Sequence, residues 1–303
     1  MDRRAAEAEA ETEEPGAEGP AFQIVAADPP PTPLVFASPH SGRHYPAGML
    51  AAAAVGPEAL RRSEDAFVDA MIAPTCEHGA AVITARLGRA WMDLNRDPWE
   101  LDPSMFSDTL PEFARGRSAR VAAGLGAIAR VAADGRDIYA GKLTFAEARA
   151  RVDGTHAPYH DALDRLLARA RSAHGIAVLI DWHSMPEAAA KTAVTPRHGK
   201  GCDIVLGDRF GASCTRKLTD LVERELELMG YRVARNAPYA GGYTTEHYGR
   251  PANRTHALQV EISRALYLEE QTLEPTGGLA TLTTDIGRLA AVLADSWPKL
   301  RPA

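Results

Sequence analysis

Two histidines, each following a short apolar run, are the residues of this chain best suited to bind a metal ion. His40 follows the run 34–37 and His183 follows the run 176–180. Each run has the length of a buried strand, so both imidazoles are expected where a strand ends. Ligands of α/β sheets bind at that carboxyl edge. A lone histidine is more often a satisfied polar group near the core, but the same local design at two strand ends favours one shared metal ion.

A zinc site of a hydrolase needs a third protein ligand and leaves one position for water. The segment Ser-Glu-Asp-Ala-Phe-Val-Asp over residues 63–69 supplies three acids, Glu64, Asp65 and Asp69. Asp65 is the leading candidate, and Asp69, four residues further along a predicted helix start, is a partner or an alternative ligand. Asp65 could instead interact favourably with the first helical turn.

A buried acid is predicted near the metal ligands. Residues 257–263 alternate, with Leu258, Val260 and Ile262 on one face and Glu261 among the polar residues on the other. A carboxylate in mid-strand is costly unless it is paired or used, and beside a metal it could act as a general base. The alternative is a strand whose second face is solvated.

The stretch 89–98 carries the donors that suit a substrate. Asn95 and Arg96 are adjacent donors for a carboxylate, and Arg89 could polarise a carbonyl group. The structural alternative is that Asp93 and Arg96 only pair with each other. A glycine-containing run, 239–250, lets backbone approach a ligand closely. It adds four candidate substrate-binding residues, Gly242, Tyr243, Thr245 and His247.

Strand-like and helix-like segments alternate along the chain, which predicts an α/β fold: a three-layer αβα sandwich around a mostly parallel, mixed central sheet. The predicted strands are 22–26, 33–38, 80–86, 90–94, 176–181, 203–206, 231–235 and 257–263. The predicted helices are 57–78, 112–133, 145–152, 156–174, 212–229 and 279–294.

Composition bounds the functional class. Residues 1–20 hold seven acids and two arginines, which is −5 of the net charge of −6, and we expect them to form a disordered acidic tail before a single zinc hydrolase domain over 21–303. The nearly neutral body carries no footprint for nucleic acid, and no apolar run is long enough to span a membrane. The tail has no secretory apolar region and the three cysteines form no CxxC pair, so we expect a cytoplasmic protein with free thiols. Its oligomeric state is left open.

No competing catalytic pattern is present. The sequence has no G-x-S-x-G nucleophile elbow, no Walker P-loop, no Rossmann glycine fingerprint and no H-E-x-x-H pair. Metal-assisted hydrolysis is therefore the chemistry that the residues favour.

Taken together, seven short segments resemble the N-formylglutamate amidohydrolase family, which is related to zinc carboxypeptidases and aspartoacylases. They occur in the family's order: Ser-Pro-His-Ser-Gly (38–42), Glu-Asp-x-x-x-Asp (64–69), Asp-Leu-Asn-Arg (93–96), Pro-Tyr-His (158–160), Asp-x-His-Ser (181–184), Gly-Gly-Tyr-x-Thr (241–245) and Gln-Val-Glu (259–261). The resemblance implies a phosphorylase/hydrolase-like αβα fold that holds one zinc ion.

The resemblance also implies roles. His40 and His183 match zinc-binding histidines, and Glu261 matches a catalytic glutamate. The pair at 95–96 matches residues that hold a substrate carboxylate, and the arginine at 89 matches one that serves the scissile carbonyl. The zinc-carboxypeptidase pattern has a glutamate three residues after the first histidine, where this chain has Arg43, so the third ligand stays open among the acids of 64–69.

The expected activity is zinc-dependent hydrolysis of an N-acyl amino acid, with N-formyl-L-glutamate giving glutamate and formate. Family members of histidine degradation continue Asp-x-His-Ser with Ser and Arg, whereas this chain has Met-Pro-Glu at 185–187. That departure leaves a differently acylated amino acid or a short peptide as the alternative substrate. A non-catalytic carboxylate-binding protein is a third hypothesis, which the retention of both histidines and the glutamate disfavours.

Overall fold

The computed structural model describes residues 19–195 and 199–300, and within them seven strands form one mixed sheet in the order β1-β3-β2-β4-β9-β7-β8. Most neighbouring strands are parallel; β1 runs antiparallel to β3, and β7 to β9. The strands are β1 Phe22–Val25, β2 Leu34–Ser38, β3 Ala81–Ala85, β4 Ala177–Met185, β7 Ile204–Gly207, β8 Val233–Arg235 and β9 Thr255–Ser263. Two short hairpins are β5 Val194–Thr195 with β6 Gly199–Lys200, and β10 Leu268–Glu269 with β11 Glu274–Pro275.

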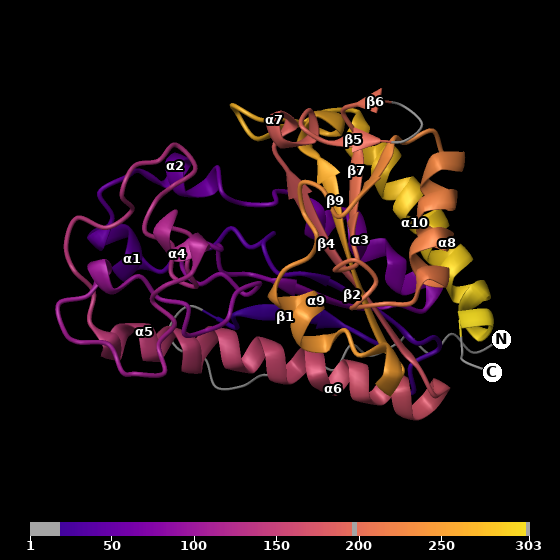
Figure 1. The fold of residues 1–303 in the computed structure, drawn as a ribbon, viewed down its shortest axis with the longest axis horizontal. Helices are drawn as coiled ribbons and strands as arrows, with labels where there is room; N and C mark the ends of the chain where they lie inside the picture. The colour runs from indigo at the N-terminus through magenta and orange to yellow at the C-terminus, as the bar shows by residue number, and fades with distance from the viewer. Residues whose placement is uncertain (1–18, 196–198, 301–303) are drawn as a thin grey trace.

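Helices cover both faces of this sheet, which confirms the predicted three-layer αβα sandwich (Figure 1). The α-helices are α1 Ala47–Ala52, α2 Pro57–Arg61, α3 Val68–Ile72, α4 Ala119–Ala122, α5 Phe145–Arg151, α6 Ala157–His174, α7 Glu187–Ala190, α8 Arg216–Leu228, α9 Tyr243–Tyr248 and α10 Gly278–Ser296. A π-helical turn, η3 Val152–His156, joins α5 to α6, and short 3₁₀ turns are η1 Ala73–His78, η2 Pro103–Met105, η4 Pro251–Asn253, η5 Arg264–Leu266 and η6 Trp297–Leu300.

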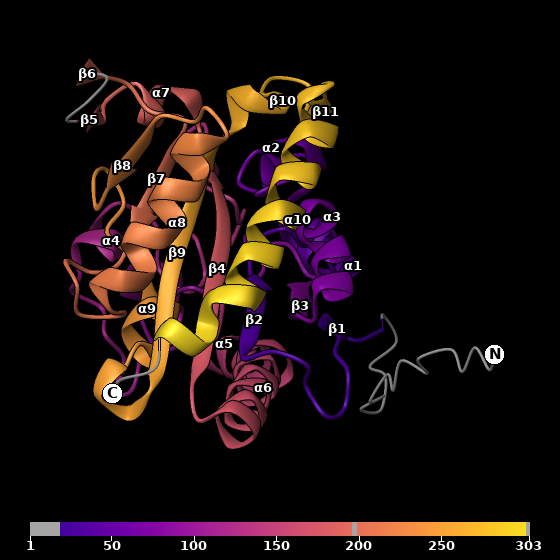
Figure 2. The ribbon, with the colours of Figure 1, turned by 90° about the vertical axis from the view of Figure 1, so that its right-hand side faces the viewer.

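Alternation along the central strands builds two cores. One face of the sheet, with Phe36, Ile180 and Leu258, packs on α3, α8 and α10. The other face, with Val35 and Leu179, packs on α6. Figure 2 shows α8 and α10 side by side in front of the sheet and α6 beyond its lower end. The small helices α1, α2, α4 and α5 lie off the sheet, on the left of Figure 1.

Three predicted elements are wrong. Residues 90–94 form turns, because Met92 and Leu94 bury their side chains in two separate clusters rather than on one sheet face. Of the helix predicted over 112–133, α4 alone forms, and glycines explain the break. Gly124 has a φ of +77°, and a Cβ on Gly126 would lie 2.4 Å from a backbone oxygen.

The helix predicted over 57–78 is divided. It forms α2, then a loop, then α3 and η1: α2 ends at Arg61, and Phe67, which precedes α3, has a left-handed φ of +65° that a continuous helix does not allow. Residues 62–66 therefore lie in the loop, and Asp65 is not at a helix start. A further difference concerns β4, which continues through Met185. His183 therefore lies inside the strand, in register with Glu261, rather than after the strand's end.

The predicted acidic tail, residues 1–20, lies almost wholly outside the described residues. Among the residues that the structure describes, no helix combines the length and the hydropathy that crossing a membrane requires.

Candidate active site

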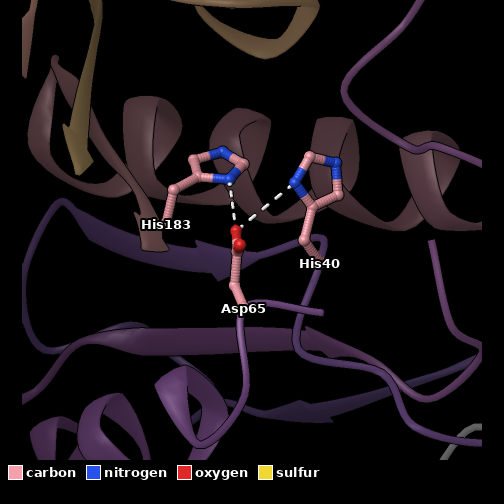
Figure 3. Close-up of side chains that lie close together, drawn as sticks. All are labelled: His40, Asp65 and His183. Carbon is pink, nitrogen blue, oxygen red and sulfur yellow. Dashed lines mark hydrogen bonds and ion pairs between the residues drawn. The ribbon is translucent and has the colours of Figure 1, made fainter. Parts of the chain in front are cut away.

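The buried side chains of His40, Asp65 and His183 converge at the carboxyl edge of the sheet (Figure 3). One ligand atom from each lies within 4.8 Å of the other two. The Oδ2 atom of Asp65 is 3.0 Å from Nδ1 of His183 and 3.4 Å from Nδ1 of His40. Two imidazole nitrogens and one carboxylate oxygen form a donor set typical of a catalytic zinc site.

A second carboxylate holds the far nitrogen of each imidazole. Nε2 of His40 lies 2.6 Å from Oδ1 of Asp93, and Nε2 of His183 lies 3.0 Å from Oδ2 of Asp181. When each carboxylate accepts a hydrogen bond from the Nε2–H group of its histidine, the Nδ1 atom of the neutral imidazole carries the lone pair, and this lone pair faces Asp65. Metal-binding histidines are usually oriented in this way. The sequence had not singled out either outer aspartate as a partner of a histidine.

The charge balance of this cluster favours a cation. Nδ1 of His40 is buried and has no hydrogen-bond partner in the part of the chain that the structure describes. Burial alone would raise the pKa of Asp65, but the adjacent imidazoles of His183 and His40 hold it well below its usual range. Burial alone would lower the pKa of His183, but Asp181 and Asp65 raise it well above its usual range. The site therefore attracts positive charge, as a metal centre must.

The other two acids of the 64–69 segment have different partners. Oε1 of Glu64 accepts a hydrogen bond of 2.8 Å from the Tyr45 hydroxyl, and burial raises the pKa of Glu64. Asp69 forms an ion pair with Arg43. Among the three acids considered from the sequence, Asp65 is thus the one that reaches both histidines.

Glu261 stands directly across from His183 in the β4–β9 register, and its side chain is buried. Nε2 of Gln259 donates a 2.8 Å hydrogen bond to its Oε1 atom. Burial raises the pKa of Glu261 to about 7. A carboxylate that exchanges protons near neutrality has the property that a general base needs. The alternative in which this strand face is solvated does not hold.

Arg89 lies beside the cluster with its side chain about one quarter exposed. Its Nη2 atom is 2.7 Å from Oδ2 of Asp93. Burial would lower the pKa of Arg89, but the charges of Asp93, Asp65 and Glu261 raise it. The guanidinium therefore lies within the field of the site's acids, and the partner of Asp93 is this arginine rather than Arg96.

The side chain of Asn95 is directed inward. Its Oδ1 accepts a 2.8 Å hydrogen bond from the Thr244 backbone, and its Nδ2 lies 3.3 Å from Oε1 of Gln259. A Cβ on Gly242 would lie 2.4 Å from that Nδ2, so the glycine is required by this contact. The amide of Asn95 thus forms contacts within the protein. Its predicted hydrogen bond to a substrate carboxylate stays a prediction.

Arg96, in contrast, contacts backbone carbonyl groups. Nη1 donates to the carbonyl of Asn95 at 2.9 Å and Nε to that of Leu125 at 3.3 Å. Burial lowers its pKa, the charges of Asp93 and Glu100 oppose this shift, and the cations Arg89 and Arg120 add to it. No carboxylate forms an ion pair with Arg96 within residues 19–195 and 199–300, so Asp93 and Glu100 act on this guanidinium without direct contact.

The remaining predicted residues lie on α9. Thr245 is fully buried and donates its hydroxyl to the carbonyl of Gly242, and its contact with a substrate stays a prediction. Tyr243 is half-buried and His247 is exposed, and their rings stack with centroids 5.1 Å apart.

Two histidines outside the candidate ligand set support the loop that carries Asn95 and Arg96. Nε2 of His160 lies 2.8 Å from the carbonyl of Leu94, and Nε2 of His156 lies 3.0 Å from that of Arg96. The Pro-Tyr-His motif contained one of them, but its spacing gave no sign of this contact.

A hydrolase is the class of protein that this geometry defines, because an αβα sheet places a buried His-Asp-His group next to a buried glutamate at the edge where ligands bind. Residues 32–268 match the family model described as N-formylglutamate amidohydrolase. The chain therefore belongs to the N-formylglutamate amidohydrolase family, and it is an amidohydrolase that acts on a C–N bond.

Individual relatives agree with this assignment. An N-formylglutamate deformylase from Pseudomonas aeruginosa is 29% identical over 242 residues, which cover 79% of this chain and 83% of that protein. A second, from Pseudomonas putida, is 32% identical over 195 residues, covering 63% of this chain and 66% of that protein. The crystal structure of an N-formylglutamate amidohydrolase from Ralstonia eutropha JMP134 superposes with a TM-score of 0.85 at 37% identity, covering 92% of this chain and 99% of that chain.

Proposed function

We propose that this chain is a zinc-dependent deformylase that hydrolyses N-formyl-L-glutamate to L-glutamate and formate. The observation that carries the proposal is the convergence of His40, Asp65 and His183, with Glu261 next to them on β9. The substrate follows from the activity named for the two deformylases and the amidohydrolase that this chain resembles.

The residues present fit a zinc ion. We propose that Nδ1 of His40, Oδ2 of Asp65 and Nδ1 of His183 hold it, because these atoms face one another and Nδ1 of His40 has no hydrogen-bond partner among the described residues. Zinc supplies Lewis-acid chemistry, polarising a carbonyl oxygen and making water more acidic.

Glu261 is the proposed general base and acid. Its carboxylate takes a proton from the attacking water as the oxygen of that water bonds to the formyl carbon. The same carboxyl group then gives the proton to the amide nitrogen, the C–N bond breaks, and formate and the amine of glutamate are released. A pKa of about 7 suits a group that must accept and return a proton within one turnover.

Two arginines have complementary roles in this proposal. Arg89 lies close enough to Asp65 and Glu261 to feel their charges, so its guanidinium is placed to stabilise the oxyanion that develops from the formyl carbonyl. Arg96 lacks a carboxylate partner among the described residues, and we assign it to a carboxylate of the substrate. Tyr243 and His247 form the stacked aromatic pair that we place beside the bound amino acid.

The wider setting is also a proposal. Cys76, Cys202 and Cys214 are free thiols, which suits a reducing compartment such as the cytoplasm. A small carboxylate substrate is the partner that the site favours.

A panel of N-acyl amino acids tests the substrate. Purified protein is assayed with N-formyl-L-glutamate, N-formyl-L-aspartate and N-acetyl-L-glutamate, while formate, acetate and free amine are measured. A preference for N-formyl-L-glutamate in kcat/KM by orders of magnitude is expected. Equal or greater kcat/KM on another member would replace the proposed substrate while keeping the reaction class.

A further inference from the structure

Arg264 is a buried arginine, 7% exposed, whose side chain contacts the candidate metal ligand Asp65. It begins η5, directly after the end of β9. Nη2 donates to Oδ1 of Asp65 at 3.1 Å and to the carbonyl of Glu64 at 2.7 Å. Nη1 donates to the carbonyl of Arg62 at 3.2 Å, and Nε donates to the hydroxyl of Ser184 at 3.1 Å. One side chain thus connects the 62–65 loop with the ends of β4 and β9.

These contacts divide the two oxygens of the Asp65 carboxylate. Arg264 occupies Oδ1, whereas Oδ2 is the atom that faces the Nδ1 atoms of both histidines. A free carboxylate can bind a metal through one oxygen or through both. A charge-assisted hydrogen bond on one oxygen leaves the other as the metal ligand and fixes its direction.

We infer that Arg264 is a positioning residue that makes Asp65 a ligand through one oxygen and sets its affinity for the metal. The inference rests on the proposed metal centre. Ser184, the residue that follows His183, contributes to this positioning because its hydroxyl accepts a hydrogen bond from Nε of Arg264 and so orients the guanidinium.

The geometry of the guanidinium matters as well as its charge. Its planar arrangement of N–H groups serves a carboxylate, two carbonyls and a hydroxyl at once, whereas a lysine ammonium is a single point of charge with three donors. Lysine at this position keeps the charge beside Asp65 but cannot keep all four contacts.

The test is metal binding by Arg264→Gln. Zinc affinity is measured by competition with a chromophoric chelator, after circular dichroism shows that the variant is folded. We expect affinity to fall about 10- to 100-fold, the usual effect of losing an outer partner of a ligand. In the cobalt-substituted protein, the visible absorption should weaken, because a released Oδ1 also binds the metal and raises its coordination number.

A matched control is Arg151→Gln. Arg151 is also buried, at 5% exposure, and donates to the carbonyl of Trp91 and the hydroxyl of Tyr139, away from Asp65. Its loss should lower stability without changing zinc affinity or the cobalt spectrum. A merely structural role of Arg264 would make its variant behave like this control.

Each outcome has one meaning. Wild-type zinc affinity and an unchanged cobalt spectrum in Arg264→Gln overturn the inference while leaving the proposed function intact. A wild-type protein that binds no metal overturns the proposed metal centre, and the inference with it. If Arg264→Gln does not fold, Arg264→Lys carries the test: weaker zinc binding than wild type supports the inference, and wild-type binding contradicts it.

Discussion

Arg96 shows how a single residue of this site differs from an ordinary surface cation. Its guanidinium donates to two backbone carbonyls, and burial lowers its pKa although the charges of Asp93 and Glu100 oppose that shift. An arriving carboxylate would supply the missing counter-charge and accept the hydrogen bonds that a guanidinium gives well. We therefore propose that this residue serves substrate binding rather than the stability of the free protein.

Arg96→Met is expected to raise the KM for N-formyl-L-glutamate about 10- to 100-fold, because a hydrogen bond to a charged group contributes about 1.5–3 kcal/mol. Zinc content should be unchanged, since this residue does not contact the ligand cluster. Steady-state kinetics and metal analysis of the same preparation check both points.

Arg117→Met is the matched control, because Arg117 is an exposed cation with no assigned contact to the site. Its KM should equal that of the wild type. An unchanged KM in Arg96→Met would remove Arg96 from the substrate-binding residues.

At the scale of elements, the π-helical turn and the first turn of α6 hold the loop that carries Asp93, Asn95 and Arg96. His156 and His160, one helical turn apart, each lie within hydrogen-bond distance of a carbonyl of that loop. Burial lowers the pKa of both histidines, which favours their neutral form in the folded protein. Two neutral imidazoles thereby fix a loop that has no regular secondary structure.

This burial predicts a loss of stability in acid. Below about pH 6.5 the unfolded chain protonates these histidines more readily than the folded chain does, so their contribution to the free energy of unfolding falls as the pH falls. Each such histidine contributes a slope of up to about 1.4 kcal/mol per pH unit. Urea unfolding of chelator-treated protein between pH 5 and 8 measures it.

His160→Gln keeps an N–H group for the carbonyl of Leu94 but does not titrate, so its stability should depend less steeply on pH below 6.5. A variant with the same slope as wild type would show that the depressed pKa of His160 does not contribute.

At the scale of the whole molecule, the sheet brings together residues that are far apart in the sequence. β2, β4 and β9 are parallel neighbours, and their carboxyl ends present His40, His183 and Glu261 at one edge. On the α6 side, β4 changes from apolar Leu179 to polar His183 as it approaches that edge. A metal ion at this position would join the loop after β2, the loop before α3 and β4, and so stabilise the whole fold.

Removal of the metal by a chelator should therefore lower the melting temperature, and added zinc should restore it. At a free zinc concentration 100 times Kd, the gain is about 2.7 kcal/mol, and each kcal/mol shifts the melting temperature of a large domain by roughly 2–4 °C. Differential scanning fluorimetry with and without zinc measures the shift.

Asp65→Asn removes the proposed anionic ligand, and its melting temperature should not respond to zinc. A response equal to that of the wild type would exclude Asp65 as a ligand.

The sequence predicted the central strands because their apolar runs are long enough to be recognised, and with them the placement of both histidines and Glu261. It could not decide the third ligand, because Asp65 faces the histidines from the loop 62–66, where side-chain periodicity predicted a continuous helix. Residues such as Asp181 and Arg264 act through neighbours brought close by the sheet, which no local pattern reports. The glycines between residues 116 and 126 interrupt the helix that side-chain periodicity alone predicts over 112–133.

The central claim is that Glu261 moves the proton at a zinc site made by His40, Asp65 and His183. Zinc content and formate release from N-formyl-L-glutamate, measured on the same preparations of wild type and Glu261→Gln, test it most directly. Both proteins should hold one zinc ion per chain, while turnover by the variant falls about 10²- to 10⁴-fold, the usual contribution of a general base. Full turnover by Glu261→Gln, or an active wild-type protein without zinc, would contradict the account.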